Sequence, residues 1–250
     1  MTRQITPTTP IQGQMPGTSG LRKKTRVFMG PNYLENFIQA TFDAIGGGNG
    51  GRYIVGGDGR FFNKEAIQTI LKMAAANGAA EVIVGQNGIL STPAVSHLIR
   101  LNAFDGGFIL SASHNPGGID EDFGVKFNAS NGGPAPEKLT AQIFEITQTI
   151  SRYKIADFDD VDLSQLGETH HGDMVVRVVD PVESYQALMA DLFDFDAIRA
   201  LFASGFTMQF DAMHAVTGPY ASAILEGTLG AAAGTVVNGI PLEDFGKGHP

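Results

Sequence analysis

The segment from Ser111 to Gly118, Ser-Ala-Ser-His-Asn-Pro-Gly-Gly, holds the residues best suited to chemistry. Ser113 is a nucleophile wherever a base can take its proton, and His114 follows it directly. Neighbours along a chain seldom point at each other, so we expect no hydrogen-bonded pair between Ser113 and His114. The G-x-S-x-G motif of serine hydrolases is absent from this segment. Two interpretations stay open: a reactive serine loop, and a capping turn whose glycines allow tight bends.

Groups that suit a phosphate stand at two other places. Residues 17–24, Gly-Thr-Ser-Gly-Leu-Arg-Lys-Lys, combine a flexible loop with the hydroxyls of Thr18 and Ser19 and the cation of Arg22. Their glycine and lysine spacing is not that of a P-loop. Lys126 lies within an apolar run, where a lysine needs an anion or a path to water. The alternative for Lys126 is simple alternation, with its side chain on the solvent face of a strand.

Composition narrows the class of protein. The chain has 250 residues, a net charge of −9 and no cysteine, which excludes disulfides, thiolate zinc sites and a cysteine nucleophile. The acidic charge argues against nucleic acid, and no segment is typical of a membrane span or a secretory signal, so we expect a soluble cytoplasmic protein. Residues 1–30 carry cations and no acid. We expect this basic segment to face a small anionic substrate; a solvated basic terminus is the alternative.

The chemistry-bearing residues must be positioned by strands and helices. Short apolar runs alternate with helical patterns, which predicts an α/β fold with a mostly parallel or mixed sheet. The expected strands are 53–55, 82–84, 107–110, 124–127 and edge strands around 175–179, and the expected helices are 32–45, the helix capped by Asn63, 91–101, 136–150 and 181–193. Residues 1–20 are expected to form an extended arm and loop. The serine segment follows strand 107–110, so it lies at the carboxyl end of the sheet, where α/β proteins bind ligands.

Two units are expected along the chain. Residues 1–188 form one complete α/β domain, which carries the serine segment. Residues 189–250 are the beginning of a second α/β domain, with strands at 206–210 and 234–237 and a helix at 218–229. Two strands and one helix are too little for an independent sheet.

The polar segments, taken together and in order, resemble the phosphoglucomutase family of the α-D-phosphohexomutase superfamily, over essentially the whole chain. The segments that carry the resemblance are P-G-T-S-G-L-R-K-K at 16–24, G-G-D-G-R-F at 56–61, G-Q-N-G-I-L-S-T-P-A-V-S at 85–96, S-A-S-H-N-P-G-G at 111–118, F-G-V-K-F-N at 123–128, N-G-G-P-A-P-E at 131–137 and P-L-E-D-F-G at 241–246. The resemblance implies one complete mixed-sheet domain of the phosphohexomutase type plus the start of a second.

The resemblance also implies the reaction. Ser113 matches the serine that carries a phosphoryl group, which passes to glucose 1-phosphate to give glucose 1,6-bisphosphate and returns to leave glucose 6-phosphate. Arg22, His114 and Lys126 match positions near the reacting phosphoryl group. Lys126 or His114 is the expected general acid–base, with Lys126 ahead, and a lysine in that role needs a lowered pKa. Thr18 and Ser19 match the loop that lines the site.

The same resemblance implies parts that these 250 residues do not contain. Mg²⁺ is expected to bridge the Ser113 phosphate to three aspartates that lie beyond Pro250, in a loop that follows P-L-E-D-F-G in the family. This chain alone is therefore expected to be inactive. The sugar-recognition loop is absent as well, which leaves a mannose or glucosamine phosphate mutase as an alternative. A phosphorylated, non-catalytic scaffold is the other alternative. Ala212 and Ala215 replace glycines of the family, which costs strain wherever those glycines have positive φ.

Overall fold

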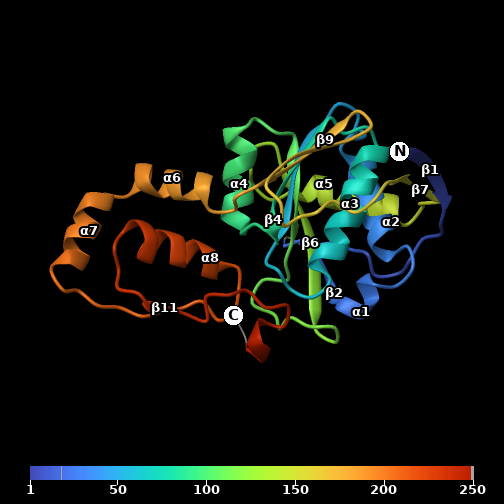
Figure 1. The fold of residues 1–250 in the computed structure, drawn as a ribbon. Coiled ribbons are helices and arrows are strands. Elements are labelled where there is room, and N and C mark those ends of the chain that lie inside the picture. The colour runs from blue at the N-terminus through green and yellow to red at the C-terminus, as the bar shows by residue number, and fades with distance from the viewer. Residues whose placement is uncertain (18, 249–250) are drawn as a thin grey trace.

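The computed structural model describes residues 1–17 and 19–248, and its centre is a seven-stranded mixed sheet (Figure 1). In spatial order the strands are β2 (Leu21–Lys24), β6 (Asp122–Ala129), β5 (Gly106–Leu110), β3 (Arg52–Gly57), β4 (Glu81–Ile89), β9 (Met174–Val179) and β8 (Gly167–His171). The adjacent strands β5, β3, β4 and β9 are parallel, whereas β6 and β8 run antiparallel to their neighbours. The predicted α/β fold with a mixed sheet is confirmed.

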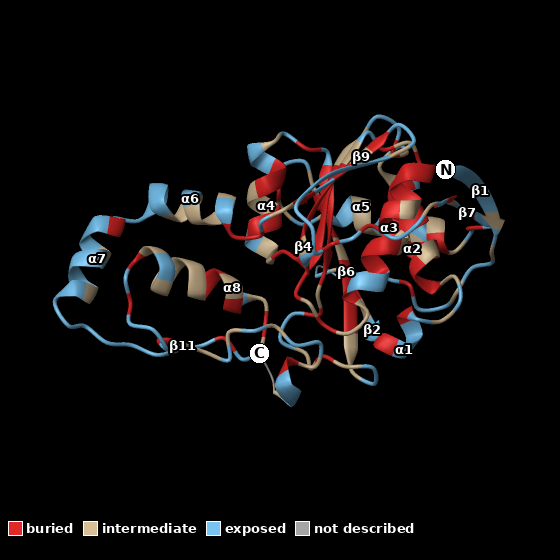
Figure 2. Cartoon of the chain, in the orientation of Figure 1, coloured by how far each residue is buried: buried red, intermediate tan, exposed pale blue. Residues whose placement is uncertain are grey.

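Helices cover both faces of this sheet. Helices α2 (Tyr33–Ala44), α3 (Asn63–Ala76) and α5 (Glu137–Thr147) pack on one face, and α4 (Thr92–Leu101) packs on the other. Because side chains alternate along a strand, Val55 of β3 joins the first core and its neighbour Ile54 joins the second. Figure 2 shows the buried residues concentrated along the sheet, α2 and α3. The serine segment follows β5 of this three-layer domain, so the sheet and its helices determine its position.

Three local expectations were wrong. Residues Thr2–Pro7 form a strand, β1, because they pair antiparallel with β7 (Arg152–Asp157), which the sequence analysis did not identify. Asn63 does not cap α3, because the N-cap position is Phe62. The side-chain amide of Asn63 instead donates to the Gly88 carbonyl, 3.1 Å away. Strand β9 is not at the edge, because β8 pairs with it on the outer side.

The C-terminal region extends away from the sheet (Figure 1) and consists of short elements. They are α6 (Glu183–Leu192), α7 (Phe195–Ala203), β10 (Phe210–Asp211), α8 (Thr217–Ala221), the π-helix η1 (Ser222–Thr228), β11 (Val236–Val237) and the 3₁₀-helix η2 (Phe245–Lys247). In the N-terminal region, the short helix α1 (Thr25–Phe28) directly follows β2. Strands β10 and β11 pair in parallel over only two residues each, much less than the expected 206–210 and 234–237.

The two predicted units meet within a helix. Helix α6 is continuous through the predicted domain boundary between residues 188 and 189, so that boundary stays a prediction. The second predicted unit ends at Pro250, which lies outside the described residues. No helix within the described ranges has both the length and the apolar character that crossing a membrane requires.

Candidate active site

The serine loop begins where β5 ends, at the carboxyl end of the parallel strands. The Ser111 amide donates to the Gly124 carbonyl of β6 at 2.9 Å, which continues the sheet by one residue. The chain then turns sharply, because Ser113 takes a left-handed φ of 59°. The Ser111 hydroxyl accepts a hydrogen bond from the Ser113 amide at 3.0 Å and supports this turn. Ser113 and His114 are both exposed, so the loop presents a hydroxyl and an imidazole to solvent.

Ser113 and His114 do contact each other, which corrects the expectation that they would not. The Ser113 Oγ lies 3.1 Å from the His114 Nδ1, within hydrogen-bond distance. Adjacent side chains rarely point at each other, but the left-handed φ of Ser113 turns the chain sharply at this position. No carboxylate of the described residues hydrogen-bonds the other ring nitrogen, so this pair is not part of a Ser-His-Asp triad.

Arg22 and Lys126 lie together on neighbouring strands. Arg22 of β2 pairs with Gly124 of β6, and Lys126 is two residues further along β6, so the two cations share a face of the sheet. Ser111 flanks Gly124 on the other side, so this face leads toward the serine loop. Burial lowers the pKa of Lys126, and the Arg22 charge lowers this pKa further. A lowered pKa is what a catalytic lysine requires; the acid–base role itself stays a prediction.

Two further features near these cations are consistent with a binding site for an anion: a buried hydrogen-bond donor and a close approach of the backbone. The Arg22 Nε is buried with no hydrogen-bond partner among the described residues, so this donor lacks the acceptor that a buried N–H normally finds. Gly20 has a φ of +90°, and a Cβ there would lie 2.4 Å from the Val125 carbonyl oxygen, so only glycine lets this loop approach Lys126 closely. Ser19 is exposed in the same turn. Thr18, the other expected loop residue, lies outside the described residues.

Three of the cations in residues 1–30 pair with carboxylates of the chain. Lys24 forms salt bridges with Glu121 and Asp122 at 3.4 and 3.0 Å, and Arg26 pairs with Asp120. Arg3 pairs with Asp173 at 3.6 Å. Because these pairs are largely exposed, each contributes little to stability. The Arg26–Asp120 pair connects α1 to the segment between the serine loop and β6.

A buried ion pair that the sequence did not predict lies below the serine loop. The Arg60 side chain is fully buried and forms a salt bridge with Asp58 at 2.9 Å. Its guanidinium also donates to the carbonyls of Ser113, Asn115 and Asp122, at 3.0, 3.4 and 2.7 Å. The segment G-G-D-G-R-F at 56–61 is part of the family resemblance, but the sequence indicated no role for its charged residues, Asp58 and Arg60. An aspartate two residues before an arginine, directly after a buried strand, was the signal that could have identified them.

The segment 241–245 closes over the loop from the C-terminal side. The Phe61 amide donates to the Glu243 carbonyl at 2.8 Å, and the Arg60 guanidinium lies 5.2 Å from the centre of the Phe245 ring. A Cβ at Gly117 would lie 2.8 Å from the Glu243 carbonyl oxygen, so the segment and the serine loop are in close contact.

The replacement of family glycines by Ala212 and Ala215 does not add the expected strain. The left-handed residues in this turn are Met213 and His214, each with a φ of 54°. Both alanines are therefore free of the positive φ that would penalise them.

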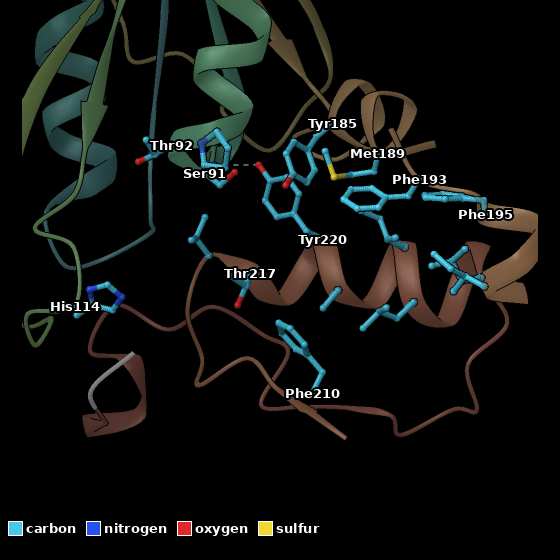
Figure 3. Close-up of a pocket in the computed structure, with 17 residues that line it drawn as sticks. Ser91, Thr92, His114, Tyr185, Met189, Phe193, Phe195, Phe210, Thr217 and Tyr220 are labelled. Carbon is cyan, nitrogen blue, oxygen red and sulfur yellow. Dashed lines mark hydrogen bonds between the residues drawn. The ribbon is translucent and has the colours of Figure 1, made fainter. Parts of the chain in front are cut away.

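Two cavities adjoin the serine loop. One, of about 370 Å³, is lined by both residues of the serine–histidine pair, by Asp58 and by residues of the C-terminal region. The other, of about 680 Å³, is apolar and lies between α6, α8 and η1 (Figure 3). Figure 3 shows His114 at its margin and the Tyr220 hydroxyl directed to Ser91, whose amide donates to it at 3.0 Å.

The described residues do not by themselves make a magnesium site. No three His, Asp or Glu side chains among residues 1–17 and 19–248 gather where they could hold a metal ion. Asp58 forms a salt bridge with Arg60, and the Oδ1 of Asp211 accepts hydrogen bonds from the Asn238 side chain and from the Met213 amide.

The expected aspartate ligands were assigned to positions beyond Pro250. Pro250 itself lies outside the described residues, and the sequence of this chain ends there. The assignment of the remaining metal ligands therefore stays a prediction, as does the role of the Ser113 phosphate in holding the metal.

The comparisons with known proteins agree with the geometry of the domain. Residues 13–154 match the family described as phosphoglucomutase/phosphomannomutase, alpha/beta/alpha domain I. The chain is 57% identical to a phosphoglucomutase of Rhizobium radiobacter, over 97% of this chain and 45% of that protein. It is 56% identical to a chloroplastic phosphoglucomutase of Arabidopsis thaliana, over 98% of this chain and 40% of that protein.

Solved structures extend the comparison. The exocytosis-sensitive phosphoprotein pp63/parafusin of Paramecium, a phosphoglucomutase in its open form, matches with a TM-score of 0.95 and 45% identity, over 99% of this chain and 47% of that one. A phosphomannomutase-like protein of Thermus thermophilus shares the fold, with a TM-score of 0.74 and 20% identity, over 96% of this chain and 49% of that one. The chain thus spans less than half the length of these relatives. From the matched domain and the high identity to several of its members, the chain belongs to the phosphoglucomutase/phosphomannomutase family.

Proposed function

We propose that the protein containing this chain interconverts glucose 1-phosphate and glucose 6-phosphate through a phosphoserine at Ser113. The observation that carries this proposal is the exposed Ser113 hydroxyl, held in a left-handed turn against His114 at the carboxyl end of the sheet. The identity of 52–57% to proteins named phosphoglucomutase supports the substrate. Sugar phosphates are therefore the proposed ligands of the 370 Å³ cavity beside Ser113.

Phosphoryl transfer would proceed at the Ser113 oxygen. The bond between phosphorus and the Ser113 Oγ breaks as a free hydroxyl of glucose 1-phosphate forms a bond to the same phosphorus. The proton of that hydroxyl passes to Lys126 in its neutral form, or to His114. In the second half the other phosphate of glucose 1,6-bisphosphate returns to Ser113, the proton is given back, and glucose 6-phosphate leaves.

The residues of this chain suit the electrostatics of that transfer. A phosphoserine carries roughly −1.5 to −2 charges at pH 7, and phosphoryl transfer depends mainly on positioning and on charge neutralisation. Arg22 keeps a permanent charge, and its buried Nε is a donor that a phosphate oxygen could satisfy. The lowered pKa of Lys126 makes its neutral, proton-accepting form more accessible.

Magnesium stays part of the proposal. Mg²⁺ prefers oxygen ligands, often a carboxylate together with a phosphate, and it would neutralise the charge on the Ser113 phosphate. Ser113 is the one ligand that we assign to this chain. The other carboxylates would have to come from outside the described residues, and no step above passes through the metal.

A coupled assay of glucose 6-phosphate formation tests the proposal in the natural full-length protein. We expect Ser113→Ala to abolish turnover and Ser130→Ala, an exposed serine in the turn after β6, to leave turnover unchanged. Full activity of Ser113→Ala would refute the phosphoserine route. Preferred turnover of mannose or glucosamine phosphate would assign the related mutase reaction instead, and a full-length protein without turnover on any of these sugars would be a binding protein.

A further inference from the structure

The buried Asp58–Arg60 pair has no role in the reaction described above, yet it lies directly below the reactive loop. All five N–H groups of the Arg60 guanidinium have an acceptor. The Nε bonds Asp58, the Nη2 bonds Asp58 and the Ser113 carbonyl, and the Nη1 bonds the carbonyls of Asn115 and Asp122. An arginine with every donor used and no exposed side-chain surface has a single orientation.

We propose that Arg60 is a positioning residue, which holds the backbone of the serine loop in the geometry that Ser113 needs for phosphoryl transfer. The planar guanidinium binds the carbonyls of Ser113 and Asn115 in the serine loop and the carbonyl of Asp122 at the start of β6, and Ser113 is the residue with the left-handed φ. A non-glycine residue in this conformation persists only where its surroundings impose it. Arg60 is the buried group that binds the carbonyl of Ser113 itself.

Asp58 balances the charge of Arg60 and helps to fix the orientation of its guanidinium. Its carboxylate accepts from the Nε and Nη2 of Arg60 at 2.9–3.0 Å and neutralises the guanidinium charge within the fold. The pair therefore contributes little net charge at Ser113, and its effect on the loop is geometric. Asn115 adds a second connection, because its side-chain amide donates to the Asp122 carboxylate at 2.8 Å. The loop and the start of β6 are thus held as one unit around Arg60.

The decisive variant is Arg60→Lys, because it distinguishes the hydrogen-bond geometry of Arg60 from its positive charge. A lysine keeps the positive charge beside Asp58 but cannot bond three carbonyls in a plane. In the natural full-length protein we expect Arg60→Lys to lower kcat for glucose 1-phosphate at least 10-fold and to leave KM within about twofold. Gln68→Leu is the matched control. Gln68 is also buried and binds two backbone groups, the carbonyl and amide of Val161, but it does not touch the serine loop.

Two readouts on the same variants do not depend on turnover. The first is hydrogen exchange of the amides from 111 to 117, and the second is the NMR signal of the His114 Nδ1, which reports its contact with the Ser113 Oγ. We expect Arg60→Lys to speed exchange in this loop at least 10-fold and to shift the His114 signal, and Gln68→Leu to do neither. Arg60→Met is expected to act in the same direction, and Arg60→Lys decides the matter if Arg60→Met does not fold.

The expected fall in kcat rests on the proposed function. Different results would refute the positioning role of Arg60 and the proposed function itself. A folded Arg60→Lys protein with native loop exchange and an unchanged His114 signal overturns the positioning role, whatever its activity. Wild-type kcat in Arg60→Lys overturns that role as well, because it would show that charge alone suffices. Absence of turnover in the wild-type protein would refute the proposed function, while the exchange and NMR measurements would still decide the role of Arg60.

Discussion

At the scale of single residues, Lys126 is the group whose environment differs most from that of a surface lysine. It is half-buried on β6, and both burial and the Arg22 charge lower the pKa of its ammonium group. The charged form is therefore less favourable in the folded chain than in an unfolded one. This cost is present at neutral pH, where the ammonium is charged, and it disappears as the pH rises through the folded pKa toward the ordinary value of about 10.4.

A direct titration checks this account of Lys126. We expect the ¹³Cε signal of Lys126 to titrate at a lower pH than that of a lysine in an unstructured peptide. Arg22→Met removes the neighbouring charge, so the midpoint should move upward in that variant. The substitution Lys23→Met, at the next position along β2, is the control and should leave the midpoint in place. An unchanged midpoint in Arg22→Met would show that the two side chains are not electrostatically coupled.

At the scale of elements, the site depends on strands β2, β5 and β6 meeting at one edge. A short apolar run predicted strand 107–110 and the loop at its carboxyl end, because a strand buried on both faces has such a run. The same pattern could not show that β2 pairs with β6, since strand pairing is not encoded in a local period. It also could not show the contact between Ser113 and His114, which depends on one left-handed residue. The nearby Asp58 could have indicated an ion pair with Arg60, but the contacts of Arg60 with the serine loop are made to backbone carbonyls, which have no sequence signature.

Gly124 lies where these strands meet the serine loop. A Cβ at this position would lie 2.3 Å from the Ser111 carbonyl oxygen, and backbone atoms cannot move aside easily. We expect Gly124→Ala to destabilise the chain by about 1–3 kcal/mol, the usual cost of overpacking. Urea unfolding measures this change. Gly227→Ala is the control, because a Cβ in that helical position meets its nearest neighbour at an ordinary 3.6 Å. Equal stability of the two variants would contradict the close packing of β6 against the loop.

At the scale of the whole molecule, the two parts of the chain differ in how much of each is buried. The first is a three-layer domain with two buried cores, and it matches the family domain over residues 13–154. The second consists of short elements around an apolar cavity of about 680 Å³, and neither α6 nor η1 buries a residue fully. The relatives are more than twice as long as this chain. Domain organisation was therefore the part of the fold that sequence patterns defined least.

The 250-residue chain tested by itself should give no mutase turnover. Its described residues supply the serine, the imidazole and the two cations, but no cluster of carboxylates that could hold Mg²⁺ beside the Ser113 phosphate. A coupled assay with glucose 1-phosphate, glucose 1,6-bisphosphate and Mg²⁺ measures this directly. Robust turnover by this chain alone would contradict the need for ligands from elsewhere.

The phosphorylation state of Ser113 is the most direct test of the central claim. The natural full-length protein is incubated with glucose 1,6-bisphosphate labelled in its phosphates, freed of excess sugar, and its phosphopeptides are mapped before and after the addition of unlabelled glucose 1-phosphate. The account predicts label on Ser113 alone, and this label passes to the sugar as turnover begins while unlabelled phosphate from the sugar replaces it on Ser113. Label on another residue, or label that stays on Ser113 while sugar phosphates interconvert, would contradict it.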